Sequence, residues 1–260
     1  VALDKPMANI AAYSEREIIK WLAMTQKYNQ IFTYPFTDQN WSKKMGLDLS
    51  DHIKVKNALS PDQAYLNISL LPNLLAKAEE NLRWFDSFKI FELERVFDKR
   101  SKGADHIDNS KKKFLPKQDK YLAGLEVSAK GAEDLFFSVK GLLESLLEHL
   151  NIEYALERID LPYADLSHKV ATQGINLGEF GMLKADLFDG GVLNAKVAFW
   201  NFNFTLMTKY LSLSKKYKAL PKFPSVYRDM AIVVDNGIAW ADLEREIKKV
   251  KTATPKTPAS

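Results

Sequence analysis

The sequence predicts an α+β fold in which one antiparallel sheet is flanked by helices. Strand-like and helix-like segments mix along the 260 residues without the regular strand–helix alternation of parallel sheets. A hydrophobic fraction of 46% and an aromatic fraction of 12% are typical of a chain that buries a core. No apolar run has transmembrane length, and cysteine is absent. We therefore expect no membrane partner and a cytoplasmic location.

The N-terminal part predicts a helix and then a strand. Residues 13–29 carry an apolar stripe at helical spacing, formed by Ile18, Ile19, Leu22 and Ala23. Ser14 and Glu17 have the spacing of a capping box, so Ser14 is the predicted N-cap. Residues 30–36 are rich in aromatic and β-branched side chains, which predicts a strand interrupted at Pro35.

A second helix and a long strand follow. Pro72 suits the first helical turn, where its missing N–H costs nothing. One side of this predicted helix carries Leu74, Leu75, Ala78 and Leu82. Residues 88–97 alternate apolar and polar side chains, as a strand does, while the polar residues 98–118 predict an inserted loop. The lysines at 111–113 are interpreted as part of this solvated loop, with phosphate contact as the alternative.

Three further elements complete the main domain. Residues 121–127 predict a strand, and residues 134–151 start extended and become a helix near Lys140. The buried face of that helix is expected to hold Leu142, Leu143, Leu146, Leu147 and Leu150. Residues 195–204 alternate and predict another strand. Two tight turns around a strand are the expected role of Gly174, Gly178 and Gly181.

The C-terminal part has a different character. Residues 213–221 are polar and contain proline, so they predict a linker, and residues 222–251 predict one strand and one helix. Residues 252–260 predict a disordered tail. Residues 213–260 hold ten Lys and Arg against five Asp and Glu. This excess of positive charge fits a segment that faces nucleic acid, and a merely soluble tail explains it equally well.

Motifs of enzyme chemistry are scarce. The sequence has no phosphate loop, no dinucleotide-binding glycine motif and no nucleophile elbow. Four histidines lack metal-ligand spacing and are expected on the surface or in loops: His52, His106, His149 and His168. Glu92 and Glu94 share one face of the predicted long strand. This permits a cation site, with the polarity of a half-exposed sheet as the alternative.

Five blocks resemble, in order, the bacterial phenylalanyl-tRNA synthetase beta subunit. They are NALSPDQAYLNISLLPNLL, FKIFELERVF, FFSVKGLLESLLEHL, GINLGEFGML and FPSVYRDMAIVVD. The last block fits the family pattern Phe-Pro-x-x-x-Arg-Asp-hydrophobic through Phe223, Pro224, Arg228 and Asp229. The chain departs from the family where Asn73 and Glu94 replace glycines.

The resemblance implies an architecture for the C-terminal part of such a subunit. Residues 1–212 would form a catalytic-like but non-catalytic module, a class II synthetase-like antiparallel sheet flanked by helices. Residues 213–221 would be a linker. Residues 222–251 would begin a ferredoxin-like anticodon-binding domain, which this sequence holds only in part, and residues 252–260 would be a tail.

The resemblance also implies a reaction, the ATP-dependent attachment of phenylalanine to its tRNA. Class II chemistry needs an arginine on the long strand for the α-phosphate and a second arginine that stacks on adenine. Arg95 and Arg100 lie near the first position, but no arginine lies between Arg158 and Arg228. The chain is therefore expected to be non-catalytic and to bind no cofactor or metal. ATP and Mg²⁺ would serve the whole enzyme, with ATP and phenylalanine bound by the alpha subunit.

The implied partners are a phenylalanyl-tRNA synthetase alpha subunit and tRNA(Phe), in a heterotetramer of two alpha and two beta subunits. The first helix and strand would make subunit contacts, and the candidate residues are Trp21, Leu22, Tyr28 and Phe32. Ordinary packing within the chain is the alternative for Trp21 and Tyr28.

Lys222 and Arg228 are the candidate tRNA contacts, because cations there attract a polyanion. A structural pair of Arg228 with Asp229 or Asp235 is the alternative. A stand-alone binding or scaffold protein derived from the synthetase fold is the alternative function. An unrelated metabolic enzyme is disfavoured by the missing motifs.

Overall fold

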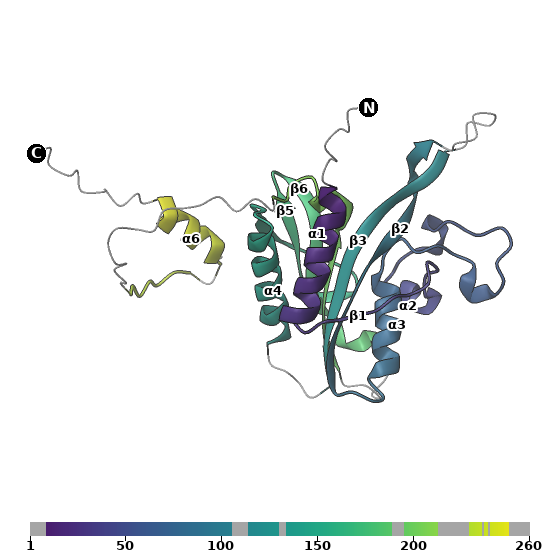
Figure 1. The fold of residues 1–260 in the computed structure, drawn as a ribbon. Coiled ribbons are helices and arrows are strands. Elements are labelled where there is room, and N and C mark those ends of the chain that lie inside the picture. Colours follow the sequence, from purple (N-terminus) through teal and green to yellow (C-terminus); the bar gives the residue numbers. More distant parts are fainter. Residues whose placement is uncertain are drawn as a thin grey trace, which may run out of the picture. The chain divides into compact units, whose positions relative to one another are not determined.

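The computed structural model describes residues 9–105, 114–129, 134–188, 195–212, 229–235, 237–238 and 240–249. The chain divides into two compact units, Val1–Lys215 and Lys216–Ser260. The first unit contains the sheet and most of the helices (Figure 1). The second contributes α6, Trp240–Lys249.

A seven-stranded sheet forms the centre of the first unit, in the order β1-β2-β3-β7-β6-β5-β4. The strands are β1 Asn29–Gln30, β2 Ser87–Asp105, β3 Phe114–Ser128, β4 Ala155–Ile159, β5 Ala164–Thr172, β6 Ile175–Leu183 and β7 Lys196–Asn203. Only β1 pairs in parallel, with β2, and the other neighbours in the sheet are antiparallel. The sheet is therefore mixed: the predicted α+β fold with helices is confirmed, and the predicted antiparallel pairing holds for every pair of neighbouring strands except β1 and β2.

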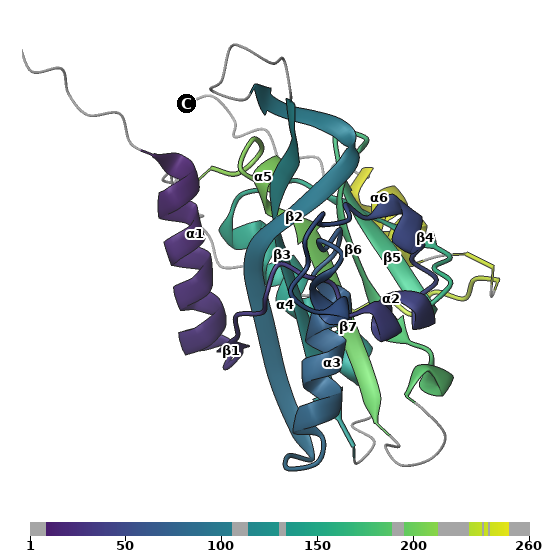
Figure 2. The same cartoon turned by 90° about the vertical axis from the view of Figure 1, so that its right-hand side faces the viewer.

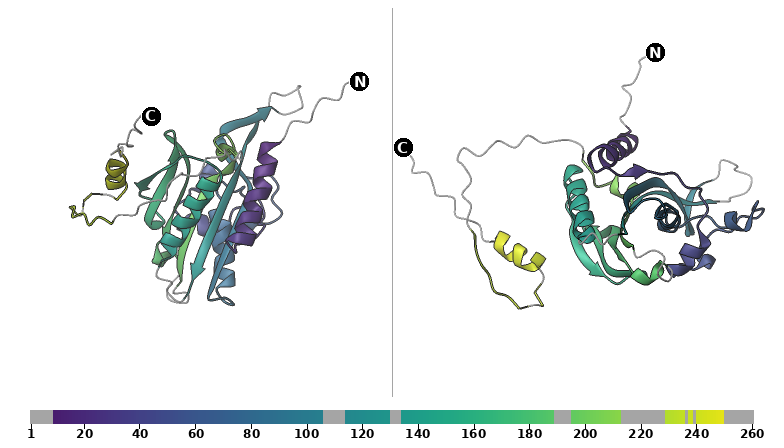
Figure 3. Two further views of the ribbon diagram at one scale, coloured as in Figure 1. Left: turned by 60° about the vertical axis from the view of Figure 1, so that its left-hand side comes forward. Right: turned by 90° about the horizontal axis from the view of Figure 1, so that it is seen from below.

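Helices cover both faces of this sheet. The helices are α1 Ile10–Lys20, α2 Gln39–Lys44, α3 Leu71–Asn81, α4 Leu135–His149 and α5 Phe204–Met207. A π-helical segment, Trp21–Thr25, continues α1, and 3₁₀ turns span Leu49–Asp51, Pro61–Gln63 and Ala185–Leu187. Figure 2 looks onto the face that carries α3, and Figure 3 shows α1 and α4 on the opposite face. We name these the α3 face and the α1 face.

The core accordingly consists of two clusters, one for each face. On the α1 face, Ile18 of α1 and the leucines of α4 pack against Phe91, Phe180 and Trp200 of the sheet. On the α3 face, Leu74 and Leu75 of α3 pack with Trp41 against sheet residues such as Phe199. Because both faces are covered, β7 is buried along nearly its whole length and does not show the predicted alternation.

The first helix begins earlier than predicted. The Asn9 side chain is the N-cap and accepts from the Ala12 backbone N–H at 3.0 Å. Ser14 lies inside the helix, where its Oγ donates to the Ile10 carbonyl at 2.6 Å. The capping-box prediction is therefore wrong, because a serine within a helix can satisfy its hydroxyl one turn back.

Two boundaries near the long hairpin also differ from the prediction. The strands β2 and β3 extend into the polar residues 98–105 and 114–118, which had predicted a loop. Cross-strand backbone hydrogen bonds do not require apolar side chains, so polar arms can continue a ladder. Helix α4 begins at Leu135 rather than near Lys140, because the apolar residues at its start also belong to the helical face buried on the sheet.

The two predicted short strands fail for a common reason. Of residues 30–36 only Gln30 lies in a strand, and residues 229–235 contain no strand. A strand requires a hydrogen-bonding neighbour along its length. The chain leaves β2 after the Ile31 N–H donates to the Phe91 carbonyl at 2.9 Å. The predicted helix in the C-terminal part is confirmed as α6, whereas the anticodon-binding domain start stays a prediction.

Candidate functional site

Polar side chains gather on the α3 face where β3, β7 and β6 run side by side. The cluster is formed by Asp119 and Tyr121 on β3, Asn201 and Asn203 on β7, Glu179 on β6 and Tyr163 before β5. Tyr121 is the register partner of Asn203, and Glu179 is the register partner of Asn201. Register partners share a face, so the pairing of the strands brings these residues together. We call them the polar cluster.

Hydrogen bonds organise the polar cluster around two carboxylates. Tyr163 Oη donates to Glu179 Oε1 at 3.1 Å, and Asn201 Nδ2 donates to the same oxygen at 3.4 Å. Asn203 Nδ2 donates to Asp119 Oδ2 at 2.9 Å. The buried Asn201 Oδ1 accepts no hydrogen bond from the part of the protein that the structure describes.

Burial shifts the protonation equilibria of this cluster. Burial raises the pKa of the Glu179 carboxyl, against the smaller lowering effects of its hydrogen bonds with Asn201 and Tyr163. Burial raises the pKa of the Tyr163 hydroxyl, and the neighbouring Glu179 carboxylate adds to the effect. Burial also raises the pKa of Tyr121. Each shift disfavours further negative charge at this place on the sheet.

A pocket of about 170 Å³ opens beside the polar cluster. Its charged lining residues are Asp51, Asp98, Asp119 and Lys117. Lys117 Nζ is paired with Asp119 Oδ2 at 2.7 Å, and this hydrogen bond raises the pKa of the lysine. Three carboxylates against one ammonium make a poor environment for a polyphosphate.

The candidate arginine of the long strand points away from this pocket. Arg95 is the register partner of Lys120, which reaches α1, so Arg95 lies on the α1 face. Its Nη1 donates to Gln118 Oε1 at 3.3 Å. Glu94, the register partner of Tyr121, occupies the α3 face instead. The side chain of Arg100 lies outside the described residues.

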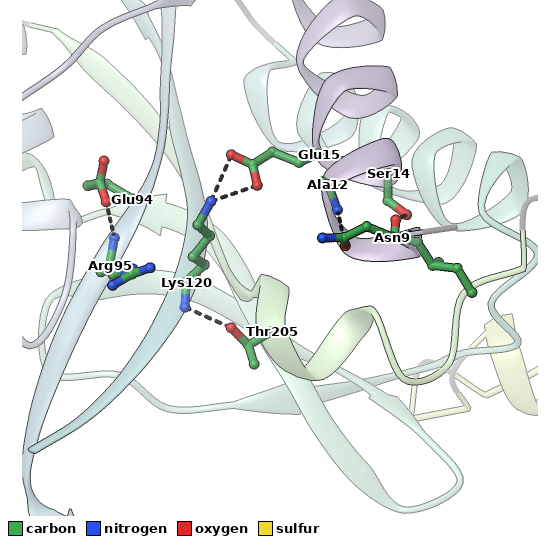
Figure 4. A network of polar contacts seen from close by, with 9 residues as sticks. Asn9, Ala12, Ser14, Glu15, Glu94, Arg95, Lys120 and Thr205 are labelled. Atoms are coloured by element: carbon green, nitrogen blue, oxygen red, sulfur yellow. Dashed lines mark hydrogen bonds and ion pairs between the residues drawn. The ribbon is translucent and has the colours of Figure 1, made fainter. Parts of the chain in front are cut away.

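Lys120 on β3 joins that strand to α1 and α5 (Figure 4). Its Nζ lies 2.8 Å and 2.6 Å from the two carboxylate oxygens of Glu15 on α1. Its backbone N–H donates to Thr205 Oγ1 of α5 at 2.8 Å. This ion pair thus adds to the apolar packing that holds α1 on the sheet.

The four interface candidates fall into two groups. Leu22 and Tyr28 are 0% and 2% exposed and belong to the core, so neither offers a surface to a partner, and this part of the prediction is corrected. Trp21 is partly buried and stacks on His149 with 6.3 Å between ring centroids. Phe32 is 75% exposed. The interface role of Trp21 and Phe32 stays a prediction.

Tyr28 belongs instead to a buried network on the α1 face that the sequence analysis missed. Its hydroxyl donates to Glu126 Oε1 at 2.7 Å and accepts from Trp200 Nε1 at 3.3 Å. Lys89 Nζ and Ser138 Oγ donate to the two oxygens of Glu126 at 3.1 Å and 2.8 Å. The available signal was a glutamate within the apolar strand sequence YLAGLEV.

Burial corrects the prediction for Glu92 and describes the surroundings of two histidines. Glu92 is 1% exposed and accepts a hydrogen bond from Thr33. The prediction that it is a surface residue of a half-exposed sheet is therefore wrong. His52 lies in a loop, as predicted, but is 2% exposed, and its Nδ1 lies 2.8 Å from the Leu66 carbonyl oxygen. His168 lies in β5, where burial and the charges of Arg158 and Lys140 lower its pKa.

Some candidates cannot be placed. Lys222, Arg228 and the lysines at 111–113 lie outside the described residues. Within the described ranges no group of three His, Asp or Glu side chains is arranged to hold a metal ion. The same ranges contain no helix that is both long enough and apolar enough to cross a membrane.

The mixed seven-stranded sheet with helices on both faces defines the class of the protein as a synthetase-fold domain. Its structure is similar to the crystal structure of pyrrolysyl-tRNA synthetase from Desulfitobacterium hafniense, with a TM-score of 0.59 and 20% identity over 76% of this chain and 69% of that one. At that identity the likeness shows the fold alone.

The chain belongs to the family described as phenylalanyl tRNA synthetase beta chain CLM domain, whose model matches residues 7–204. It is 31% identical over 251 residues to the phenylalanine–tRNA ligase beta subunit of Fusobacterium nucleatum, covering 90% of this chain and 29% of the relative. The corresponding subunit of Clostridium tetani is 28% identical, over 85% of this chain and 27% of the relative. The chain thus spans less than a third of these relatives.

Proposed function

We propose that this chain is a non-catalytic portion of a phenylalanine–tRNA ligase beta subunit that scaffolds a catalytic alpha subunit. The observation that carries the proposal is the family match over residues 7–204 on a sheet whose α3 face is lined by carboxylates. The whole enzyme would attach phenylalanine to tRNA(Phe) with ATP and Mg²⁺, and ATP would bind the alpha subunit. The assembly would be a heterotetramer of two alpha and two beta subunits.

The charge of the α3 face supports a role without ATP chemistry. Glu94 on β2 and Asp119 on β3 lie on this side of the sheet, and Asp51 and Asp98 also line the pocket there. Phosphoryl and adenylyl transfer depend on cations that hold the phosphates, and Arg95 lies on the opposite face. Bound ATP would therefore be repelled here rather than stabilised.

The sheet edge beside β1 supports a role in assembly. Phe32 and Tyr34 are 75% and 76% exposed, and Met24 in the preceding π-helical segment is 68% exposed. Large uncovered side chains grouped along one short stretch of chain are typical of protein interfaces. Relatives that are named beta subunits have, by that name, a partner subunit.

The contribution to tRNA binding is proposed for the C-terminal part. It rests on the excess of Lys and Arg over Asp and Glu in residues 213–260 and on Lys222 and Arg228. Charge reversal of Lys222 should weaken tRNA binding and reduce its dependence on salt. An unchanged affinity and salt slope would remove Lys222 from the proposed contacts.

Light scattering on a sizing column tests the assembly. The chain is run alone and then with a bacterial phenylalanine–tRNA ligase alpha subunit, and a new species at the mass of a complex is the expected result. Calorimetry with ATP on the chain alone should give no binding heat. Two unmixed peaks would favour the stand-alone scaffold, whereas ATP turnover by this chain would contradict a non-catalytic role.

A further inference from the structure

Residues 32–36 cross the edge of the sheet without being part of it. The hydrogen bonds between β1 and β2 end near Ile31. The next backbone hydrogen bond of this segment is at Pro35, whose carbonyl accepts from the Asn67 N–H at 2.9 Å. Between these points Phe32 and Tyr34 point outward and are the most exposed aromatic side chains of this stretch. We call residues 32–36 the presenting segment.

Glu92 holds the start of the presenting segment. Its Oε1 accepts from the Thr33 backbone N–H at 2.6 Å, and its Oε2 accepts from Thr33 Oγ1 at 2.9 Å. A buried carboxylate that receives two hydrogen bonds from one residue fixes that residue more firmly than a single neutral contact. Burial raises the pKa of Glu92, while the two Thr33 contacts oppose the shift.

Asn73 holds the remainder of the presenting segment with a single carboxamide. Its Nδ2 lies 3.1 Å from Thr33 Oγ1 and 3.0 Å from each of the carbonyl oxygens of Tyr34 and Phe36. Its Oδ1 accepts from the Asp38 backbone N–H at 2.8 Å. Contacts at both ends of the segment therefore converge on one side chain that is 6% exposed.

Asn73 and Glu92 belong to regular elements that are packed into the core. Asn73 lies in the first turn of α3, whose next residues Leu74 and Leu75 are fully buried. Glu92 lies in the paired part of β2, opposite Ala123.

We propose that Asn73 and Glu92 are positioning residues that hold the presenting segment in one conformation, so that Phe32 and Tyr34 meet the catalytic partner subunit already ordered. This inference rests on the proposed scaffold function. An interface segment that is ordered before binding does not lose conformational freedom during binding. The partner surface should offer an apolar recess for the two aromatic rings.

The test compares matched alanine variants of one helix. Asn73→Ala removes the brace, whereas Asn81→Ala removes an α3 carboxamide whose Nδ2 contacts the Lys77 carbonyl of the same helix at 2.7 Å. Affinity for a bacterial phenylalanine–tRNA ligase alpha subunit is measured for both. We expect Asn73→Ala to weaken binding about tenfold, equivalent to about 1.4 kcal/mol, and Asn81→Ala to leave it unchanged.

A double-mutant cycle separates positioning from loss of fold. In a chain that also carries Phe32→Ala and Tyr34→Ala, Asn73→Ala should have no further effect on affinity. Thr33→Val supplies a second variant that removes hydroxyl contacts to both Glu92 and Asn73 while it keeps the side-chain shape. Amide hydrogen exchange at Thr33 and Asp38 should accelerate in Asn73→Ala, whereas exchange in the central strands β3 and β7 should stay slow and so show that the sheet remains folded.

The outcomes distinguish this inference from the proposed function. Tight binding by every variant, or an equal loss for Asn73→Ala in both backgrounds, would overturn the positioning role alone. If the unmodified chain does not bind the alpha subunit, the proposed function fails and the positioning role fails with it. A loss confined to the background with both aromatic rings would support the inference.

Discussion

The indole of Trp200 on β7 lies against the backbone of Gly124 on β3, and the two residues are register partners. A Cβ at position 124 would lie 2.3 Å from Cζ2 and 2.6 Å from Cε2 of the indole, and 2.9 Å from the Ile90 carbonyl oxygen. The same indole donates to Tyr28 Oη. Glycine at position 124 therefore allows the Trp200 indole to pack against β3 and to reach Tyr28.

Replacing this glycine tests the close approach. Gly124→Ala should destabilise the chain by about 1–3 kcal/mol, because the new methyl group forces the indole or the strand to move. Gly141→Ala on α4 is the matched control, since its Cβ would meet nothing within 4 Å. It should stabilise by about 0.5–1 kcal/mol through helix propensity. Urea unfolding measures the free energy of unfolding of both variants, which should fall for Gly124→Ala and rise for Gly141→Ala.

The buried hydroxyl of Tyr28 makes a second prediction. Tyr28→Phe leaves Glu126 and Trp200 each without one hydrogen-bond partner, and we expect a loss of about 1–3 kcal/mol in the free energy of unfolding. Tyr13→Phe, at a position that is 49% exposed, serves as the control in the same urea titration. Equal effects of the two substitutions would show that the buried network adds no stability.

The raised pKa of Glu179 predicts a pH dependence with a definite sign. The folded chain holds this proton to higher pH than the unfolded chain, whose carboxyl has the ordinary value of 4.5. The folded state therefore binds more protons above pH 4.5, and stability falls as pH rises through the folded pKa. Glu179→Gln should remove this fall because an amide does not titrate, and its oxygen can still accept from Tyr163 and Asn201.

Thermal unfolding between pH 4 and pH 8 measures the Glu179 effect. The unmodified chain should show a steeper loss of stability with rising pH than Glu179→Gln. Glu153→Gln, which removes an exposed carboxylate, is the control. Parallel pH profiles for the unmodified chain and Glu179→Gln would show that the carboxyl titrates alike in the folded and unfolded states.

The ion pair between Lys120 and Glu15 predicts a small, salt-sensitive contribution. The two side chains are 32% and 27% exposed, so solvent screens the pair and Glu15→Gln should cost about 0.2–1 kcal/mol. The difference from the unmodified chain should shrink in 1 M salt, where the Debye length is about 3 Å. A cost that salt leaves untouched would instead indicate altered packing of α1.

Because of its position, Arg95 is expected to make no contribution to the activation of phenylalanine by the whole enzyme. Arg95→Ala should change phenylalanine activation by less than about twofold in a reconstituted ligase that contains this chain, because the side chain lies on the α1 face, away from the pocket on the α3 face. Pyrophosphate exchange measures this step. A large fall in activation would place this arginine in the reaction and contradict the non-catalytic role.

Periodic patterns allowed most of the fold to be predicted. The leucines of α3 and α4 face the core as their spacing indicates, and β2 contains the whole of the predicted strand 88–97. Boundaries failed where polar side chains continue a regular element, as in the outer arms of β2 and β3. Local sequence does not show whether a neighbouring strand is present to supply the hydrogen bonds.

Less of the candidate site than of the fold could be predicted from the sequence. Tyr28 and Leu22 were candidates for an interface because large apolar residues occur both in cores and on contact surfaces, and only the folded chain shows that they are buried. The polar cluster is assembled from β3, β6 and β7, so its members are distant in sequence. Their proximity depends on strand register, which no local pattern specifies.

The central place of β7 has a consequence for synthesis of the protein. This strand is the last of the seven along the chain, yet it lies between β3 and β6 and hydrogen-bonds to both. As the nascent chain emerges from the ribosome, the hairpins on either side can form early, but they remain unjoined until residues 196–203 appear. During that interval the edges of β3 and β6 are open templates for aggregation. Chaperones should therefore hold the growing polypeptide most strongly just before Lys196 is translated.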